Sequence, residues 1–203
     1  MRLKDTYKTI ADPSEPILLK EKNSKFFGYA FPVDSEEQIK LHLDALRKTH
    51  PQAGHYCYAY QIGIDKVKYR ANDDGEPANT AGPPIYGQIQ SNVLTNILIV
   101  VVRIFGGTKL GVGGLIAAYR ESARRSIEAA HIVERTIDVK FQIQFDYKNM
   151  NKVMRIIKEK NLQIIAQDFT ENCRIEVAVR KKDEAKVKSV FEQILEIRII
   201  RKE

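Results

Sequence analysis

The segment from Ile137 to Phe145 alternates strictly between apolar and polar residues, and this alternation constrains the fold more than any other feature of the chain. A period of two predicts a strand that buries one face and exposes the other. The following segments predict a helix that ends near Asn161, strands at 162–169 and 174–179, a helix from Asp183 and a strand at 197–200. The order βαββαβ predicts a ferredoxin-like domain, in which two helices back one antiparallel sheet.

The hydrophobic pattern changes near Arg135, so we predict a domain boundary at residues 132–136, with domains at 1–135 and 136–203. A chain of 203 residues has room for two small domains. In the first domain, the apolar run within 96–105 predicts a buried strand. Its other predicted elements are strands at 17–19 and 25–31, a helix at 36–49, a hairpin of 55–62 and 67–70, and a short helix at 85–90. The fold class is therefore α+β, with two domains.

Composition argues against a membrane-spanning or secreted protein. The longest apolar run, Ile97 to Val102, is far shorter than the roughly 20 residues that a membrane helix needs. The first 15 residues contain no apolar signal region. The two cysteines, Cys57 and Cys173, lie far apart, which argues against a disulfide scaffold. We therefore expect a cytoplasmic protein with no membrane partner.

The positive charge of the first domain is concentrated in one segment. The chain has a formal net charge of +7, which favours anionic partners such as nucleic acid. The segment from Arg103 to Arg125 carries five basic residues and one acidic residue, a net charge of +4, while the rest of residues 1–135 sums to −1. The basic excess therefore coincides with a predicted strand, a glycine cluster and the helix that begins near Leu115.

The glycine cluster from Gly106 to Gly114 is the first candidate site. A glycine-rich turn before a helix start can bind an anion, because free amide groups point outward and glycine allows close approach. The P-loop and dinucleotide fingerprints are both absent. We expect phosphate or RNA contacts from Arg103, Gly106, Gly107, Lys109, Gly113, Gly114, Arg120 and Arg124. The alternatives are a purely structural turn and an ion pair between Arg124 and Glu128 at helical spacing.

The acidic loop that begins at Asp73 is the second candidate. Asp73, Asp74 and Glu76 could hold Mg²⁺ or share acid and base roles in an enzyme. They could equally form a structured loop that orders the binding surface, with Glu76 neutralising a basic neighbour.

A histidine and a cysteine lie two residues apart on a predicted strand, so their side chains share a face. His55 and Cys57 could form a base and nucleophile pair. Cys57 could instead be a small buried apolar residue. No Cys and His set has zinc spacing. We assign no catalytic residue and expect no metal and no cofactor.

The polar face of the C-terminal sheet is a further candidate. Lys140, Gln142 and Gln144 lie on that face of the 137–145 strand. Because no RNA-recognition signature accompanies them, we expect a docking sheet for an unidentified partner.

Three ordered motif blocks resemble the YigZ/IMPACT family. They are His55 to Ala59, the DDGEPANTAG block from Asp73 to Gly82, and the VVVRIFGGTKLGVGGL block from Val100 to Leu115. Asn79 departs from the family pattern, since bacterial members often have glycine there. The resemblance implies a two-layer α/β sandwich, similar to the second domain of a small-subunit ribosomal protein. It also implies a ferredoxin-like second domain similar to the last domain of translation elongation factor G.

The resemblance also implies a function, because eukaryotic members of the family regulate translation. We expect a translation-associated regulator that binds RNA, the ribosome or a translation factor through the basic glycine loop and helix. An enzyme of unknown reaction and a protein-only adaptor that docks through the C-terminal sheet are the alternatives.

Overall fold

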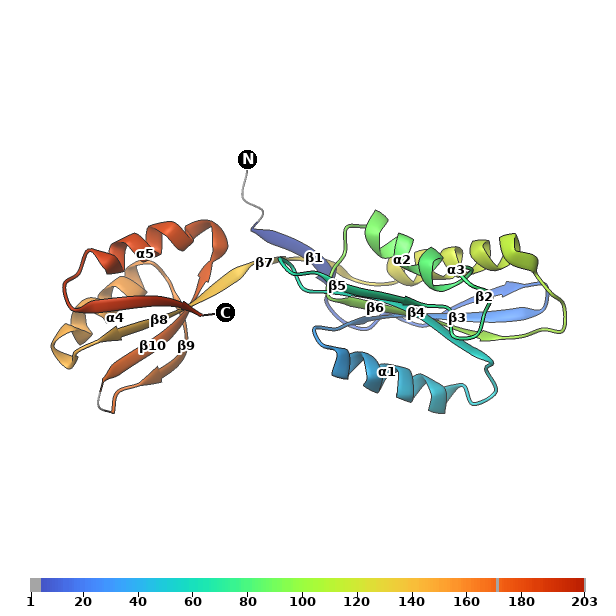
Figure 1. Ribbon diagram of the computed structural model, residues 1–203, viewed down its shortest axis with the longest axis horizontal. Coiled ribbons are helices and arrows are strands. Elements are labelled where there is room, and N and C mark those ends of the chain that lie inside the picture. The colour runs from blue at the N-terminus through green and yellow to red at the C-terminus, as the bar shows by residue number, and fades with distance from the viewer. Residues whose placement is uncertain (1–4, 171, 203) are drawn as a thin grey trace. The chain divides into compact units, whose positions relative to one another are not determined.

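The computed structural model describes residues 5–170 and 172–202, and it divides into two compact units. One unit comprises residues 7–135, and the other comprises residues 136–202 together with Asp5 and Thr6. Both units combine helices with antiparallel sheets (Figure 1), so the expected two-domain α+β class is confirmed. None of the helices in the described residues is long and apolar enough to cross a membrane.

The first unit is built on a five-stranded antiparallel sheet of order β2-β3-β6-β4-β5. The strands are β2 (Ile17–Glu21), β3 (Ser24–Pro32), β4 (His55–Ile62), β5 (Lys68–Asn72) and β6 (Ile97–Ile104). The apolar run predicted as a buried strand is β6, the central strand, and its first seven residues are buried. A separate two-stranded sheet pairs β1 (Thr6–Ile10) with β7 (Ile132–Thr136).

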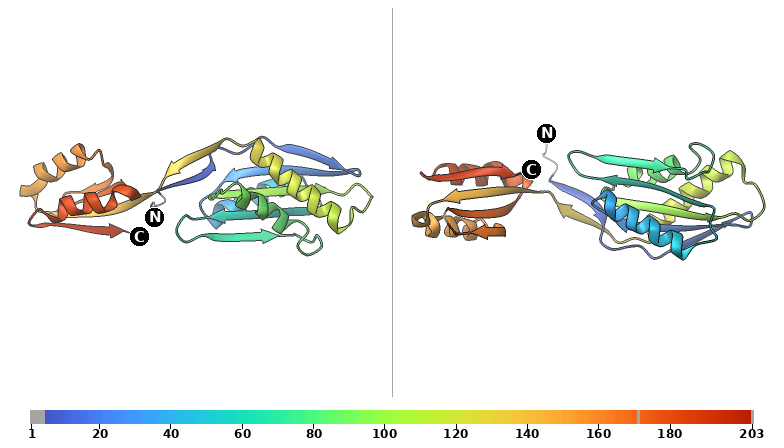
Figure 2. Two further views of the ribbon diagram at one scale, coloured as in Figure 1. Left: turned by 90° about the horizontal axis from the view of Figure 1, so that it is seen from above. Right: turned by 60° about the horizontal axis from the view of Figure 1, so that its bottom comes forward.

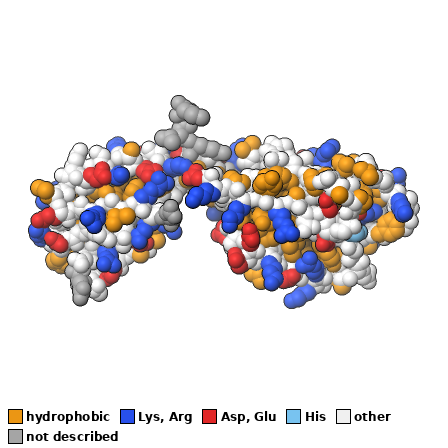
Figure 3. Space-filling view, viewed as in Figure 1, with side chains coloured by type: hydrophobic (Ala, Val, Ile, Leu, Met, Phe, Trp, Pro, Cys, Tyr) orange, Lys and Arg blue, Asp and Glu red, His pale blue; other side chains and the backbone are white. Residues whose placement is uncertain are grey.

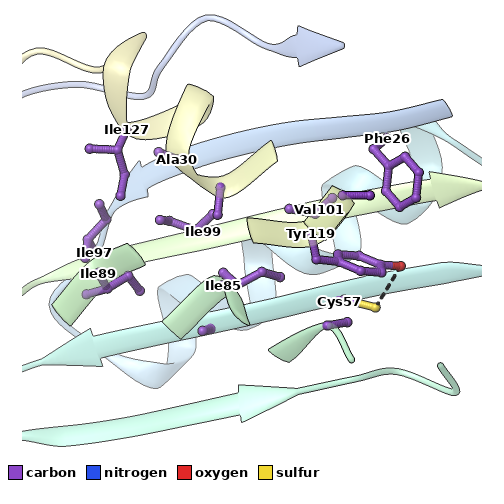
Figure 4. Close-up of a cluster of buried hydrophobic side chains, with 14 of the residues drawn as sticks. Phe26, Ala30, Cys57, Ile85, Ile89, Ile97, Ile99, Val101, Tyr119 and Ile127 are labelled. Atoms are coloured by element: carbon purple, nitrogen blue, oxygen red, sulfur yellow. Dashed lines mark hydrogen bonds between the residues drawn. The ribbon is translucent and has the colours of Figure 1, made fainter. Parts of the chain in front are cut away.

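Helices cover both faces of this sheet (Figure 2). Helix α1 (Glu36–Thr49) packs Ile39, Leu43 and Leu46 on one face. Helices α2 (Gly82–Ser91) and α3 (Gly111–Glu128) pack on the other face, in the core drawn in Figure 4. The unit therefore has three layers, one more than the expected two-layer sandwich.

Local sequence signals explain where α1 and α2 begin. The Ser35 side chain accepts a hydrogen bond from the Gln38 amide, as the predicted capping box requires. Helix α2 has prolines in its first turn, where a missing N–H group costs nothing. It begins at Gly82, three residues before the predicted start.

The second unit has the predicted βαββαβ order and a four-stranded antiparallel sheet of order β11-β8-β10-β9. Its elements are β8 (Asp138–Phe145), α4 (Met150–Glu159), β9 (Gln163–Asp168), β10 (Cys173–Arg180), α5 (Glu184–Glu192) and β11 (Ile197–Lys202). The apolar residues of β8 join its core, while Lys140 is exposed and Gln142 and Gln144 are half-buried on the opposite face. This is the arrangement that the alternation predicted.

Candidate functional site

The acidic loop between β5 and α2 is folded by its own carboxylates. Asp73 Oδ1 accepts hydrogen bonds from the amides of Ala81 and Gly82, at 2.9 and 2.8 Å, and thereby caps the start of α2. Its Oδ2 accepts from the Asn79 amide at 2.9 Å. Asp74 Oδ2 accepts from the Tyr56 amide at 2.7 Å, which ties the loop to β4. Both aspartates therefore serve the structured-loop role, and their bonds to backbone amides do not support the predicted alternative of a magnesium site.

The side chain of Glu76, in the same loop, is buried in an ion pair. Its Oε1 accepts a hydrogen bond from Arg103 Nη1 at 2.6 Å and another from the Tyr119 hydroxyl at 2.7 Å. The side chains of Glu76 and Arg103 are 4% and 6% exposed. The Arg103 guanidinium also lies 5.4 Å from the ring centroids of Phe26 and Phe105. Glu76 thus neutralises a basic residue that is far from it in the sequence.

This burial corrects one expected phosphate contact. Arg103 is engaged by Glu76 and covered by aromatic rings, so its guanidinium is not available to a phosphate in this arrangement. Ion pairs also occupy Arg124, which bonds to Glu121 at 2.7 Å and to Glu128. The alternative pairing of Arg124 with Glu128 is therefore the one observed. Arg120 is exposed, and no ion pair joins it to another described residue.

Cys57 and His55 do not form a nucleophile and base pair. The Cys57 thiol is fully buried and donates to the Asp73 carbonyl oxygen at 2.9 Å. It lies 3.3 Å from the Tyr119 hydroxyl (Figure 4). Burial raises the pKa of this thiol far above its ordinary value, and the nearby carboxylates add to the effect. His55 Nδ1 instead bonds to the Asp74 carbonyl oxygen at 2.9 Å. Across the described residues, no three His, Cys, Asp or Glu side chains converge in a way that could hold a metal ion.

The glycine loop between β6 and α3 packs against the β2–β3 hairpin. A Cβ atom at Gly106 would lie 2.0 Å from the Asn23 carbonyl carbon, so only glycine fits this contact. The Gly106 amide also donates to Ser24 Oγ at 3.2 Å. Lys22, in the hairpin turn, and Lys109, in the loop, are both exposed. The contact therefore brings two lysine-bearing turns together at one end of the sheet.

The start of α3 adds amide groups to this end of the sheet. The helix begins at Gly111, and its N-cap residue, Leu110, makes no side-chain capping hydrogen bond. Gly111, Val112 and Gly113 are exposed, and their amides belong to the first turn, where backbone donors have no intrahelical partner. Gly114 lies one residue further, where helix geometry gives its amide the Leu110 carbonyl. We define the glycine corner as Lys22, Lys109 and the first-turn amides of α3.

Lys22 was absent from the predicted site residues, although the sequence contained a signal for it. The hairpin carries Lys20, Lys22 and Lys25 against a single acid, Glu21. A charge count over consecutive residues did not connect this run with the glycine cluster, because more than 80 residues separate the two segments. In the view of Figure 3, basic and acidic side chains are scattered over both units, so the contacts locate the corner better than the overall charge does.

Comparison with known proteins assigns this arrangement to a class. The sequence model of the Impact N-terminal domain matches residues 22–127, which hold the sheet from β3 to β6, the acidic loop and the glycine corner. A solved structure described as that of a hypothetical protein superposes with a TM-score of 0.76, at 25% identity, and covers 99% of both chains. The class is therefore a two-domain protein that carries an Impact N-terminal domain.

The bacterial relatives extend the match beyond that domain. IMPACT family member YvyE of Bacillus subtilis is 33% identical over 178 residues, which are 88% of this chain and 82% of the relative. IMPACT family member YigZ of Escherichia coli is 30% identical over 171 residues, 82% of this chain and 84% of the relative. The chain belongs to the IMPACT family.

Proposed function

We propose that this protein is a translation-associated regulator that binds RNA through the glycine corner. The observation that carries the proposal is the contact of Gly106 with Asn23, which joins the lysine-rich hairpin to the glycine loop. A phosphate site combines cationic side chains with free backbone donors. This contact brings Lys22 of the hairpin to the loop that carries Lys109 and leads into the first turn of α3. Lys22 takes the place of Arg103 in the proposed phosphate contacts.

Family membership supports the link to translation. A relative named Protein IMPACT homolog in Dictyostelium discoideum and one named Protein IMPACT in Oryctolagus cuniculus each match 45% of this chain, which is 27% and 30% of those relatives. Eukaryotic proteins of this family regulate translation, and we transfer only that broad role. The family resemblance also implies that the second unit is similar to the last domain of elongation factor G, and this expectation points in the same direction.

The arrangement of the acidic loop and Cys57 does not support the enzyme alternative. The two aspartates are bonded to backbone amides, and the thiol is buried away from His55. The adaptor alternative keeps a polar sheet face at Lys140, Gln142 and Gln144, but no feature of that face favours a particular protein. RNA binding at the glycine corner is therefore the function that the geometry supports best.

A salt-resolved titration with a mixed single-stranded RNA pool tests the proposal. Each phosphate contact on a single strand contributes about −0.7 to the slope of log K against log salt. Lys22→Glu/Lys109→Glu should weaken binding and reduce the magnitude of the slope by about 1.4. The control Lys40→Glu/Lys48→Glu makes the same charge change on α1 and should leave the slope near that of the wild type. Equal slopes for the two double variants would reject the glycine corner.

A further inference from the structure

His55 Nε2 and the Glu76 carboxylate form a pair of neighbouring hydrogen-bond acceptors that do not bond to each other. His55 Nε2 lies 4.0 Å from Glu76 Oε1, which is too far for a hydrogen bond. The His55 side chain is 27% exposed, and Glu76 lies below it at 4%. The pair therefore faces the surface through the histidine ring.

The tautomer of His55 follows from its other nitrogen. Nδ1 lies 2.9 Å from the Asp74 carbonyl oxygen, and a carbonyl oxygen only accepts, so Nδ1 carries the proton. In the neutral ring, Nε2 then presents a lone pair. The two bonds that Glu76 accepts from described residues both reach Oε1, which leaves Oε2 as an acceptor for a ligand. A ligand that fits this pair must supply hydrogen-bond donors.

The acceptor pair lies at the same end of the sheet as the glycine corner. His55 pairs with Arg103 in β6, and Phe26 of β3 pairs with Arg103 from the other side. Beyond Arg103, the chain continues through Phe105, which is 51% exposed, into Gly106. Neighbouring strands are about 4.8 Å apart, so β4 and β3 lie about 10 Å apart across β6. A short stretch of single-stranded RNA spans a separation of that order, and the exposed Phe105 directly follows β6, the strand between β3 and β4.

A hydroxyl group suits the pair better than a metal ion. A divalent cation would need ligands beyond one histidine and one carboxylate, and the described residues provide no third acidic, histidine or cysteine side chain there. A ribose hydroxyl donates one hydrogen bond, and carboxylates accept such bonds from ribose in dinucleotide sites. The 2′-hydroxyl is also the group that distinguishes RNA from DNA.

We infer that His55 Nε2 and the Glu76 carboxylate accept hydrogen bonds from ribose hydroxyls, so that the site selects RNA over DNA. The inference rests on the proposed function, since the same strand would contact the glycine corner. The hydroxyls can come from internal 2′-positions or from the 2′,3′-diol at a 3′ end. Both sources present the same chemistry.

Competition binding of four strands with one base sequence tests the inference in the full chain. The strands are RNA, DNA, fully 2′-O-methylated RNA, and DNA that ends in one ribonucleotide. RNA should bind about tenfold tighter than DNA, because an unsatisfied buried acceptor costs at least as much as one good hydrogen bond. The methylated strand keeps the RNA shape without the donor, and it should bind as weakly as DNA if internal hydroxyls are read. If DNA that ends in one ribonucleotide binds as tightly as RNA, the preference for RNA comes from the 2′,3′-diol at the 3′ end.

A matched pair of variants connects the preference to His55. His55→Asn places an amide donor near the position of the histidine Nδ1 but removes the Nε2 acceptor. The ratio of RNA affinity to DNA affinity should therefore fall toward one. His55→Gln keeps a polar atom near Nε2 and should retain part of the ratio. Equal binding of RNA and DNA by the wild type, with salt dependence intact, overturns this inference and leaves the proposed function standing. Absence of RNA binding overturns both.

Discussion

At the scale of single residues, the Glu76 carboxylate joins three elements. It holds Arg103 of β6 and the Tyr119 hydroxyl of α3 while it sits in the loop that leads to α2. The Tyr119 hydroxyl that Glu76 accepts from is itself buried. Burial raises the pKa of this hydroxyl far above its ordinary value. A change at Glu76 therefore affects the whole end of the sheet.

Glu76→Gln should destabilise the protein by about 3–5 kcal/mol, because it leaves the Arg103 charge buried without a counter-charge. Urea unfolding followed by circular dichroism measures this cost. The double variant Glu76→Gln/Arg103→Met removes both charges and should recover much of the loss. A double variant that is less stable than the single variant would show that the ion pair is not the source of the cost.

Glu121 should make the stability depend on pH. Hydrogen bonds from Arg124 and then Arg125 lower the pKa of this carboxyl to about 2. A depressed folded-state pKa stabilises the fold above the unfolded-state pKa, and this contribution is lost as pH falls from about 5 toward 2. The side chains are one-third to one-half exposed, so solvent screening limits the contribution to about 1 kcal/mol or less.

Glu121→Gln should therefore be slightly less stable than the wild type at pH 7 and nearly equal to it at pH 2.5. Thermal unfolding at a series of pH values compares the two proteins. Curves that stay parallel over the whole range would exclude a role for this ion-pair cluster.

At the scale of elements, two glycines around the start of α3 have opposite roles. Gly106→Ala would place a Cβ 2.0 Å from Asn23, so the glycine loop must move away from the hairpin. We expect a loss of about 1–3 kcal/mol in stability and weaker RNA binding. Gly113 is a helical residue whose Cβ would meet nothing within 4 Å. Gly113→Ala should stabilise the helix by about 0.5–1 kcal/mol and weaken RNA binding less than Gly106→Ala does, because it leaves the glycine loop in contact with the hairpin.

Denaturant unfolding and RNA titration of both alanine variants provide the measurement. The Gly113→Ala protein serves as the control for adding one methyl group near the site. Equal effects of the two substitutions would mean that the contact with the hairpin does not organise the glycine corner.

The elements with a strong local period were predictable from sequence, and those defined by distant contacts were not. The alternation in 137–145 and the apolar run at β6 identified their strands correctly. Strands β1 and β7 were missed, because these short segments pair with each other across most of the chain and lack a clear pattern. Helix α2 begins before its predicted start because Asp73 caps it from nine residues away.

The candidate site shows the same division. Sequence motifs located the acidic loop and the glycine cluster, and Glu76 does neutralise a basic residue as one interpretation required. The charge count treated all basic residues of the 103–125 segment alike. It did not reveal that Arg103 and Arg125 are paired, because their partners depend on packing and helix position. Helical spacing had indicated Glu128 as a partner of Arg124, and that pair is observed. Lys22 joins the corner only through the contact at Gly106.

At the scale of the whole molecule, the two units have separate hydrophobic cores. Ile99 lies in the first core and Ile143 in the second, and both side chains are fully buried. Replacing either with alanine should cost about 2–5 kcal/mol, through lost apolar burial and the cavity left behind. Because the cores share no residues, each substitution should destabilise only its own unit.

Hydrogen exchange followed by mass spectrometry resolves the two units by peptide. Ile143→Ala should accelerate exchange in β8 and β10 and leave β4 and β6 protected, and Ile99→Ala should do the reverse. Acceleration of all four strands by either variant would show that the units unfold as one. Independent units would mean that RNA binding at the glycine corner survives Ile143→Ala, because that corner belongs entirely to residues 7–135.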